Sequence, residues 1–550
     1  MGPSGLKYGC IIAALFCALI SNAQQLNIPL NHTMNIGWER VIADSDSLSF
    51  HSGFKPLIEN SIIDYGKFQE YHKTQVKKHF AWFFKDSNWL KRKFKWENLF
   101  EKRGEDFYFD VNPLFYLEYG RDLANDNSMK FFKNGRGVIV NGHLTEKVSF
   151  STSFMENQMY LPTYLRNYSD AISSQYFNGA VLRPESPIVP GQGRVKRYGT
   201  LNRQYDFAYA QGYVSYSPTS TMNFQFGNGK LFIGDGYRSV LLSDNSFSFP
   251  HLRFTGSFLK GRMQYTVVHA ALQNMIRMRE FSSPEGLFEK KAASFMYLSF
   301  QVNKKLQLGL FEGAMHRRHS DDQKLLPVDV FNLQPLIGLN FIRRGFINQN
   351  GNVLLGANFK YKPFRKSYFY GQLATDDPSN GRWAYQLGAK WFDAFKTKNL
   401  FFQLEIDHTA KAFYTGLSGR VNYAHFNQPL ALTGGGGTFE TIFRGYYRTD
   451  DYFYEVRFHY QTYRSYSGSN QVGKDVFLPS DAYSDPSIPS AMAHLFYRDI
   501  SFGYILNPLY NMHLLIGWFH RDLRSVEAPY KTSYLYIGFR TSLSNFYYDI

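Results

Sequence analysis

The sequence predicts an all-β membrane barrel of about 18 antiparallel strands with a short N-terminal helical element. One observation is the composition: aromatic residues make up 18% of the 550 residues, yet the mean hydropathy is −0.36. A barrel that alternates lipid-facing and water-facing residues accounts for both values. The other two observations are an apolar–polar alternation of period two and an alternation of short and long connections. We therefore expect one large domain.

The clearest strand pair covers residues 438–463. In its second half, even positions from Tyr452 to Tyr460 are apolar or aromatic, and odd positions from Glu455 to Gln461 are polar. Such a period predicts a strand with one face toward lipid. Each half is about ten residues long, as a tilted membrane-crossing strand requires. Because the polar residues 449–451 separate the halves, we predict a β-hairpin.

The same pattern recurs through the rest of the chain. The predicted strands cover residues 107–119, 130–142, 146–156, 204–217, 220–230, 251–259, 262–271, 293–303, 306–314, 353–362, 367–374, 383–392, 400–408, 438–447, 452–463, 494–506, 510–521 and 531–543. Links after even-numbered strands are short, whereas most links after odd-numbered strands are long, as at 157–203 and 315–352. This sorting is typical of an outer-membrane barrel with periplasmic short turns. We expect both chain ends on that side, and residues 543–550 nearly match the aromatic-rich last strand of such barrels.

Residues 1–23 are predicted to be a secretory signal. The apolar run Ile11–Ile20 precedes Ser21–Ala23, a small-residue cleavage site. Both cysteines, Cys10 and Cys17, lie inside this segment, so the exported chain would contain no thiol and no disulfide.

Residues 24–105 are expected to be a periplasmic-side segment with helices, followed by the barrel at 106–550. Residues 24–60 show no clear period, whereas residues 64–103 carry apolar residues near helical spacing. One or two amphipathic helices there would plug the barrel mouth, lie on the inner leaflet, or form an ordinary packed hairpin.

The net charge of +16 bears on partners. It is explained either by solubility and a charged pore wall, or by attraction to acidic sugar polymers and lipopolysaccharide phosphates. Outer-membrane lipid, surface polysaccharide or lipopolysaccharide, and other outer-membrane proteins are the partner classes we expect. Nucleic acid is not expected for an exported chain.

The stretch from Phe226 to Pro250 departs most from the strand pattern. Four of the ten residues 227–236 are glycine, which permits positive φ and close backbone approach. Arg238–Ser243 is compatible with one apolar helical turn. We expect so apolar a loop to fold into the barrel lumen. Gly229-Lys230 lacks the frame of a phosphate-binding loop, and we expect no cofactor.

This stretch resembles the signature of the Wzi capsule-assembly family, in which a Gly-rich segment leads into a Leu-Leu-Ser-(Asp)-Asn run and an aromatic-Pro. The matching residues are Leu241, Leu242, Ser243, Asn245, Phe249 and Pro250. Gly234–Ser239 is more similar to the Wzi-like, RemB-type outer-membrane proteins of gliding bacteria. A second similar segment is Phe331–Pro335, followed by 354–363 and 370–373. Phe226 and Phe232 stand where the family motif carries tryptophans.

The resemblance covers roughly residues 105–550 in layout. It implies a barrel of about 18 strands, with periplasmic-side helices, that binds surface polysaccharide. Polysaccharide binding calls for flat aromatic faces beside charged or amide groups. The candidate residues are Asp235, Tyr237, Arg238, Asp244 and Asn245 in the loop, with Arg203 and Tyr209 on or next to a neighbouring strand.

A structural alternative applies to the same residues. Asp235 and Arg238 would pair with lumen charges and hold the loop in place. Lumen-facing residues of the 438–463 hairpin, such as Glu440 and Arg457, are more typical of a structural charge ladder than of a ligand site.

Enzyme and metal chemistry find little support in the sequence. His316 and His319, beside Asp321-Asp322, have only a weak metal-ligand spacing. The chain has 15 histidines, and none sits in a nucleophile motif. We expect a non-enzymatic surface protein, without metal, that engages polysaccharide or an adhesin in capsule attachment or gliding motility. The alternative is a channel, or a barrel subunit of a larger envelope complex.

Overall fold

The computed structural model describes most of the chain. The described residues are 26–46, 48, 50–58, 89–125, 130–172, 174–177, 180–184, 187–199, 203–278, 288–466, 474–478, 489–526 and 530–550. The predicted signal at 1–23 and the greater part of the predicted helical region, 64–88, lie outside them.

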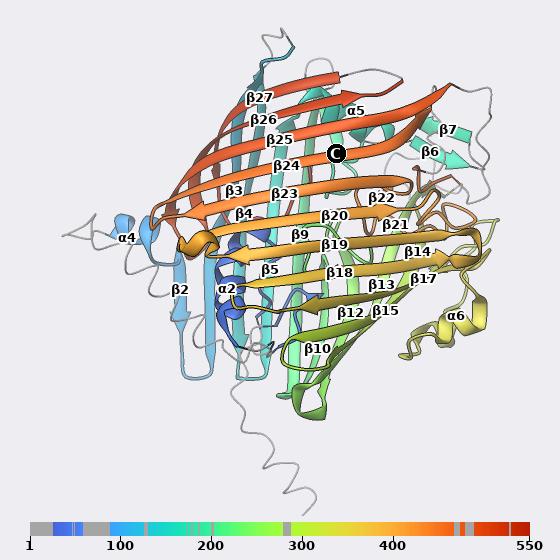
Figure 1. The fold of residues 1–550 in the computed structure, drawn as a ribbon, viewed down its shortest axis with the longest axis horizontal. Helices are drawn as coiled ribbons and strands as arrows, with labels where there is room; N and C mark the ends of the chain where they lie inside the picture. The colour runs from blue at the N-terminus through green and yellow to red at the C-terminus, as the bar shows by residue number, and fades with distance from the viewer. Residues whose placement is uncertain are drawn as a thin grey trace, which may run out of the picture.

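Eighteen strands of the described residues form a closed antiparallel barrel (Figure 1). They are β3 (Phe107–Asp122), β4 (Lys130–Leu144), β5 (Val148–Tyr160), β9 (Gln204–Thr219), β10 (Met222–Gly229), β12 (Phe249–Phe258), β13 (Met263–Arg277), β14 (Phe288–Gln301), β15 (Leu306–Arg317), β17 (Gly351–Tyr361), β18 (Ser367–Asp377), β19 (Arg382–Phe392), β20 (Leu400–Thr409), β23 (Thr438–Arg448), β24 (Tyr452–Tyr466), β25 (Ser490–Asn507), β26 (Met512–Arg524) and β27 (Tyr530–Arg540). Each strand pairs with the next, and β27 closes the barrel on β3 with Tyr534 opposite Asp122. The predicted fold class is confirmed.

Shorter elements accompany the barrel. The helices are α2 (His32–Asp44), α4 (Trp89–Lys95), α5 (Thr163–Ala171) and α6 (Leu339–Arg344), with 3-10 turns η3 (Leu259–Gly261), η4 (Val330–Leu333), η5 (Pro378–Asn380) and η6 (Ala394–Lys396). The short strands are β1 (Phe54–Lys55), β2 (Phe100–Arg103), β6 (Ser174–Phe177), β7 (Ala180–Pro184), β8 (Lys196–Tyr198), β11 (Phe232–Ile233), β16 (Ile347–Asn348), β21 (Ala424–His425) and β22 (Gln428–Pro429). Among the described residues, no helix has the length and apolar character needed to cross a bilayer.

The strands alternate between a lipid face and a lumen face, as predicted. On β24, Tyr452 and Tyr454 are 43% and 48% exposed, whereas the intervening Phe453 is buried in the lumen. Similar outward apolar residues recur on the other strands, for example Leu310 on β15 and Leu387 on β19. A closed cylinder with an apolar outer wall is suited to lipid surroundings. The fold is therefore that of a membrane-spanning β-barrel.

Residues 24–60, which show no clear period in the sequence, nevertheless contain α2. The Asn31 Oδ1 caps this helix, accepting hydrogen bonds from the N–H groups of Thr33 and Met34 at 3.1 and 2.9 Å. The helix lies inside the barrel at the short-turn rim, where Arg40 pairs with Asp393 at 2.9 Å. The buried face of α2 contains Asn35 beside Ile36, Trp38 and Ile42, so its apolar stripe is interrupted and the pattern that predicts surface helices is weak.

The predicted final strand is too long at its end. β27 ends at Arg540, and residues 541–550 (the C-terminal tail) leave the wall for the lumen, so the expected aromatic-rich last strand is wrong. Asn31 Nδ2 donates to Leu543 O at 2.6 Å, which ties the tail to the start of α2. β2 pairs with the lower edge of β3, with Phe100 opposite Val111, and covers the part of that edge that β27 does not reach.

Glycines on the lumen face let tyrosine rings lie flat against the neighbouring strand. A Cβ on Gly388 of β19 would lie 2.3 Å from the Tyr370 ring of β18, and one on Gly120 of β3 would lie 2.4 Å from the Tyr534 ring of β27. Only glycine tolerates so close an approach. The first of these pairs directs the Tyr370 hydroxyl into the lumenal site described next.

Candidate functional site

The connection from β10 to β12 folds into the lumen, as predicted. Every residue from Lys230 to Ser246 is buried. We call residues 230–248 the inner plug. Its apolar members Val240, Leu241 and Leu242 pack with Phe311 of the wall and Tyr423 of the β20–β23 connection. The expected helical turn at Arg238–Ser243 does not form, because these residues adopt bends whose backbone groups bond to wall side chains.

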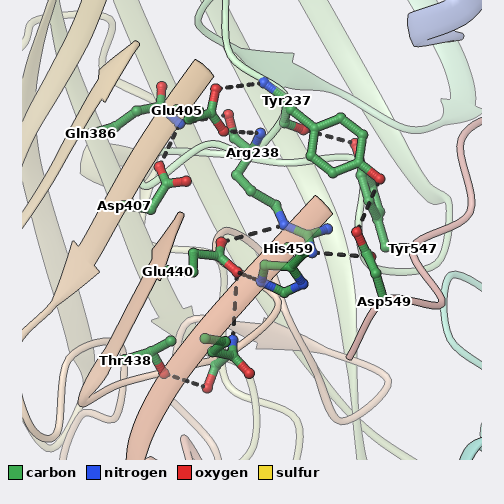
Figure 2. A network of polar contacts seen from close by, with 12 residues as sticks. Tyr237, Arg238, Gln386, Glu405, Asp407, Thr438, Glu440, His459, Tyr547 and Asp549 are labelled. Atoms are coloured by element: carbon green, nitrogen blue, oxygen red, sulfur yellow. Dashed lines mark hydrogen bonds and ion pairs between the residues drawn. The ribbon is translucent and has the colours of Figure 1, made fainter. Parts of the chain in front are cut away.

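The Arg238 side chain lies at the centre of the plug contacts (Figure 2). It is 1% exposed, with its Nε 3.4 Å from Glu440 and an Nη 3.0 Å from Asp549 of the tail. Its guanidinium lies over the rings of Tyr237 and Tyr547. Burial alone would lower the pKa of Arg238, but the carboxylates of Asp549 and Glu440 outweigh burial and raise it.

Glu405 of β20 holds the plug backbone at the same point. Its two carboxylate oxygens accept the N–H groups of Tyr237 and Arg238 at 2.8 and 2.7 Å. The Tyr370 hydroxyl donates to the same carboxylate at 2.6 Å, and Gln386 Nε2 donates to the Arg238 carbonyl at 2.9 Å. These bonds satisfy the buried backbone groups of the bend on both sides.

Asp235 joins the plug to the N-terminal segment. Its carboxylate accepts the Ser52 hydroxyl at 2.8 Å and lies 3.1 Å from Lys360 and 3.8 Å from Lys55. Burial alone would raise the pKa of Asp235, but the two ammonium groups outweigh it and hold the pKa well below its usual range. The short antiparallel pairing of β1 with β11 extends this junction, with Phe54 opposite Ile233 and Lys55 opposite Phe232.

Asp244 and Asn245 anchor the far end of the plug. The Tyr547 hydroxyl and Asn545 Nδ2 donate to the Asp244 carboxylate at 2.7 and 2.8 Å, and Asn245 Nδ2 donates to Pro429 O at 3.1 Å. Burial raises the pKa of Asp244. The C-terminal tail therefore lies across the plug. It contacts the plug at Tyr237 and Arg238 and again at Asp244.

The structure brings five of the predicted site residues together and separates the other two. Asp235, Tyr237, Arg238, Asp244 and Asn245 are buried and bonded within the protein, in the manner of the structural alternative. The hydroxyl of Tyr209, on β9, donates to Met155 Sδ at 3.2 Å. Arg203 is exposed and precedes β9.

Sequence reasoning missed several residues of this network, among them Glu405, Tyr547 and Asp549. Asp549 is the one acidic residue of the tail, and it could have indicated a buried cation partner. Nothing in the alternation of β20 distinguishes Glu405 from other lumen-facing polar residues.

A cavity of about 200 Å³ lies between the plug, the tail and the wall, toward the short-turn rim. Its wall carries nine tyrosines and a set of charged groups. The lining includes Tyr116, Tyr164, Tyr237, Tyr446, Tyr497, Tyr534, Tyr536, Tyr547, Tyr548, Arg444, Arg457, Arg540, Glu118, Glu455 and Asp499. The charges are largely paired, as between Arg457 and Asp499 at 2.7 Å. Flat rings beside paired charges suit a polar ring such as a sugar.

Fold and site together define a plugged outer-membrane barrel. Comparisons with known proteins agree at the level of the fold. No protein-family profile and no curated protein matches the chain in sequence. Among solved structures, the chain is similar to Wzi, an outer membrane protein of Escherichia coli involved in group 1 capsule assembly and described as a carbohydrate-binding β-barrel. The TM-score is 0.53 at 12% identity, covering 94% of this chain and 100% of that one.

Two further barrels are less similar. OccAB2 of Acinetobacter baumannii gives a TM-score of 0.41 at 12% identity over 78% of this chain and 97% of that one. OpdK of Pseudomonas aeruginosa, solved with vanillate, gives 0.40 at 9% identity over 78% and 98%. The likeness to Wzi shows a shared fold, and the two lower scores carry no argument about function.

Proposed function

We propose that this barrel is a non-enzymatic outer-membrane protein that engages surface polysaccharide or an adhesin, in capsule attachment or gliding motility. The observation that carries the proposal is the tyrosine-lined cavity beside the inner plug. The Wzi-type and RemB-type sequence motifs support it, as does the carbohydrate binding named for the Wzi structure.

The predicted site residues divide into two roles under this proposal. Tyr237 lines the cavity and offers its ring to a sugar. Arg238, Asp235, Asp244 and Asn245 act indirectly, because their bonds fix the plug on which Tyr237 stands. Arg203 and Tyr209 stay candidates for a separate contact.

The proposal is tested by calorimetric titration of the purified barrel with capsular polysaccharide and with lipopolysaccharide-derived glycan. Ser501 lines the cavity, and Ser501→Phe fills it without removing a charged pair. We expect this variant to lose binding while Arg203→Ala retains it. Loss with Arg203→Ala alone would place the site outside the cavity, and absence of binding by the folded wild-type barrel would refute the proposal.

A channel is the second candidate, and the same cavity is the observation that favours it. The cavity runs beside the plug and tail and includes Asn511 and His513 near a short turn. Planar-bilayer recording separates the two functions. The binding protein predicts little steady conductance in the wild type and a large pore when residues 231–246 are replaced by a short Gly-Ser linker. A large steady wild-type pore would favour the channel.

A further inference from the structure

The second motif of the sequence, Phe331–Pro335, lies in the β15–β17 connection, which folds against the outside of the barrel wall. On β15, Phe311 and Met315 pack in the lumenal core with the inner plug. Since side chains alternate along a strand, Glu312 and His316 point to the opposite, lipid-facing side. Ser294 of β14 points outward for the same reason, because its neighbour Phe295 lies in the lumenal core.

Residues 328–346, which we call the outer strap, bond to these outward groups. Asn340 Nδ2 donates to Glu312 Oε1 at 2.6 Å, and the Gly338 N–H donates to the other oxygen. Ser294 Oγ donates to Asn332 O at 2.7 Å. Glu312 is 0% exposed in consequence, although its strand position faces lipid. A carboxylate at such a position must be covered and hydrogen-bonded.

Further bonds fix the strap at its ends. The Tyr265 hydroxyl of β13 donates to Pro335 O, and Arg344 lies 3.1 Å from His316 Nδ1 of β15. Arg344 also pairs with Asp329 at 3.0 Å. Figure 1 shows α6, which is part of the strap, outside the barrel. The strap is therefore built onto the wall and does not project freely from the rim.

The face of the strap that points away from the wall is apolar. Six of its side chains are between 49% and 78% exposed. They are Val328, Val330, Phe331, Leu333, Leu336 and Ile342. An exposed apolar cluster of this kind marks a membrane or protein contact.

We propose that the outer strap lies in the outer leaflet of the outer membrane, with these side chains among the acyl chains of lipopolysaccharide. Continuity with the wall supports lipid as the occupant, because Leu308 and Leu310 on the same strand already face lipid and are 43% and 51% exposed. Charge supports it too. Residues 316–346 contain five Lys/Arg and three Asp, an excess that suits lipid phosphates.

The strap thus covers polar side chains on the lipid-facing side of the wall. Glu312 and His316 interrupt the apolar outer face of β15, and the strap covers them with its polar side while it presents a replacement apolar surface to lipid. The inference is independent of polysaccharide binding in the lumen.

Site-specific fluorescence tests the proposal on the full barrel in vesicles that contain lipopolysaccharide. Residues 18–550 contain no cysteine, so Phe331→Cys and Ile342→Cys can each carry a single environment-sensitive dye. Leu310→Cys on the wall is the lipid-facing control, and Asp322→Cys, exposed in the same connection, is the aqueous control. Heat-modifiable gel mobility verifies that each variant is folded.

We expect quenchers attached to lipid acyl chains to quench the dyes at 331 and 342 at least half as strongly as the dye at 310, and iodide to quench mainly the dye at 322. Quenching of 331 and 342 by iodide to the extent seen at 322 would overturn the proposal. Protection of both positions from both quenchers would also overturn it, since a protein partner would then cover the strap.

Discussion

The inner plug and the outer strap are both connections at the long-loop rim, and both are apolar, yet they fold to opposite sides of one wall. In the plug, Val240, Leu241 and Leu242 are 0% exposed. In the strap, Val330 and Ile342 are the most exposed of the apolar side chains. Hydrophobicity alone therefore does not decide which way such a loop folds.

The direction in which each loop folds matches the side of the wall on which its bonded carboxylates lie. Glu405 and Glu440 face the lumen, where they take the plug's backbone N–H groups and the Arg238 guanidinium. Glu312 faces outward, where it takes the Gly338 N–H and the Asn340 amide. A buried carboxylate needs donors, and each loop supplies them on the side where its carboxylate lies. The apolar residues of the plug then pack against protein in the lumen, whereas those of the strap stay exposed on the outside of the barrel.

Replacing Arg238, the buried cation of the plug, should lower the free energy of unfolding more than any other change that we consider. Arg238→Met leaves Glu440 and Asp549 buried beside an apolar side chain. Removing one partner of a buried ion pair costs about 3–5 kcal/mol. Urea unfolding in detergent, followed by tryptophan fluorescence, measures the free energy of unfolding. Arg203→Met, at an exposed site, should change it by less than about 0.5 kcal/mol. Equal stability of the two variants would show that the plug is not held by this pair.

A matched truncation on each loop tests the comparison directly. Leu241→Ala in the plug removes a side chain that is 0% exposed, and should cost about 2–5 kcal/mol. Leu336→Ala in the strap removes one that is 62% exposed, and in detergent should cost less than about 0.5 kcal/mol. The same unfolding titration measures both. Similar costs would mean that the two loops do not differ in packing.

The sequence predicted the wall well because its signal is local. Each strand needs only its own alternation, and sorted turn lengths then give topology. The inward direction of the plug was also predictable, since residues 231–242 are too apolar for water. Contacts between segments that are distant in the sequence could not be predicted. Asn31 meets Leu543, and Arg238 meets Asp549, through separations of 512 and 311 residues that no local pattern encodes.

The strap left one trace in the sequence. Glu312 and His316 occupy positions whose parity on β15 is that of Leu308 and Leu310, so they break the apolar face of the strand. A charged residue at a lipid-facing position indicates that something covers it, although it does not indicate what. The partner residues Gly338 and Asn340 come from a connection without a strand pattern, and only the structure supplies them.

The amide that covers Glu312 should have an intermediate effect. Asn340→Ala leaves a buried carboxylate oxygen without its donor, which should cost about 1–3 kcal/mol. Asn380→Ala is the matched control, because Asn380 Nδ2 also donates to a carboxylate, that of Asp377 at 2.6 Å, but in an exposed turn. Unfolding titrations compare the two. If the control costs as much as Asn340→Ala, the strap gives Glu312 no protection beyond that of a surface hydrogen bond.

The smallest effect that we predict is a pH dependence inside the lumen. His32 begins α2, and its Nε2 lies 2.8 Å from the Tyr547 hydroxyl. Burial, and then the positive charge of Arg444, lower the pKa of His32 well below its ordinary value of 6.5. Well above pH 6.5 the imidazole is neutral in both the folded and the unfolded chain, so it contributes no pH dependence there.

As the pH falls below 6.5, the unfolded chain binds a proton at His32 that the folded chain refuses. The free energy of unfolding then falls by up to about 1.4 kcal/mol per pH unit from this residue. Between pH 7.5 and 5.5, we expect the wild type to lose about 1 kcal/mol more stability than His32→Asn, measured by urea titration at each pH. His143→Asn, on the wall, controls for removal of an imidazole elsewhere. If wild type and His32→Asn lose the same free energy of unfolding, solvent reaches the plug at α2. The inner plug and the outer strap would then both be hydrated, and they would differ mainly in which side of the wall they occupy.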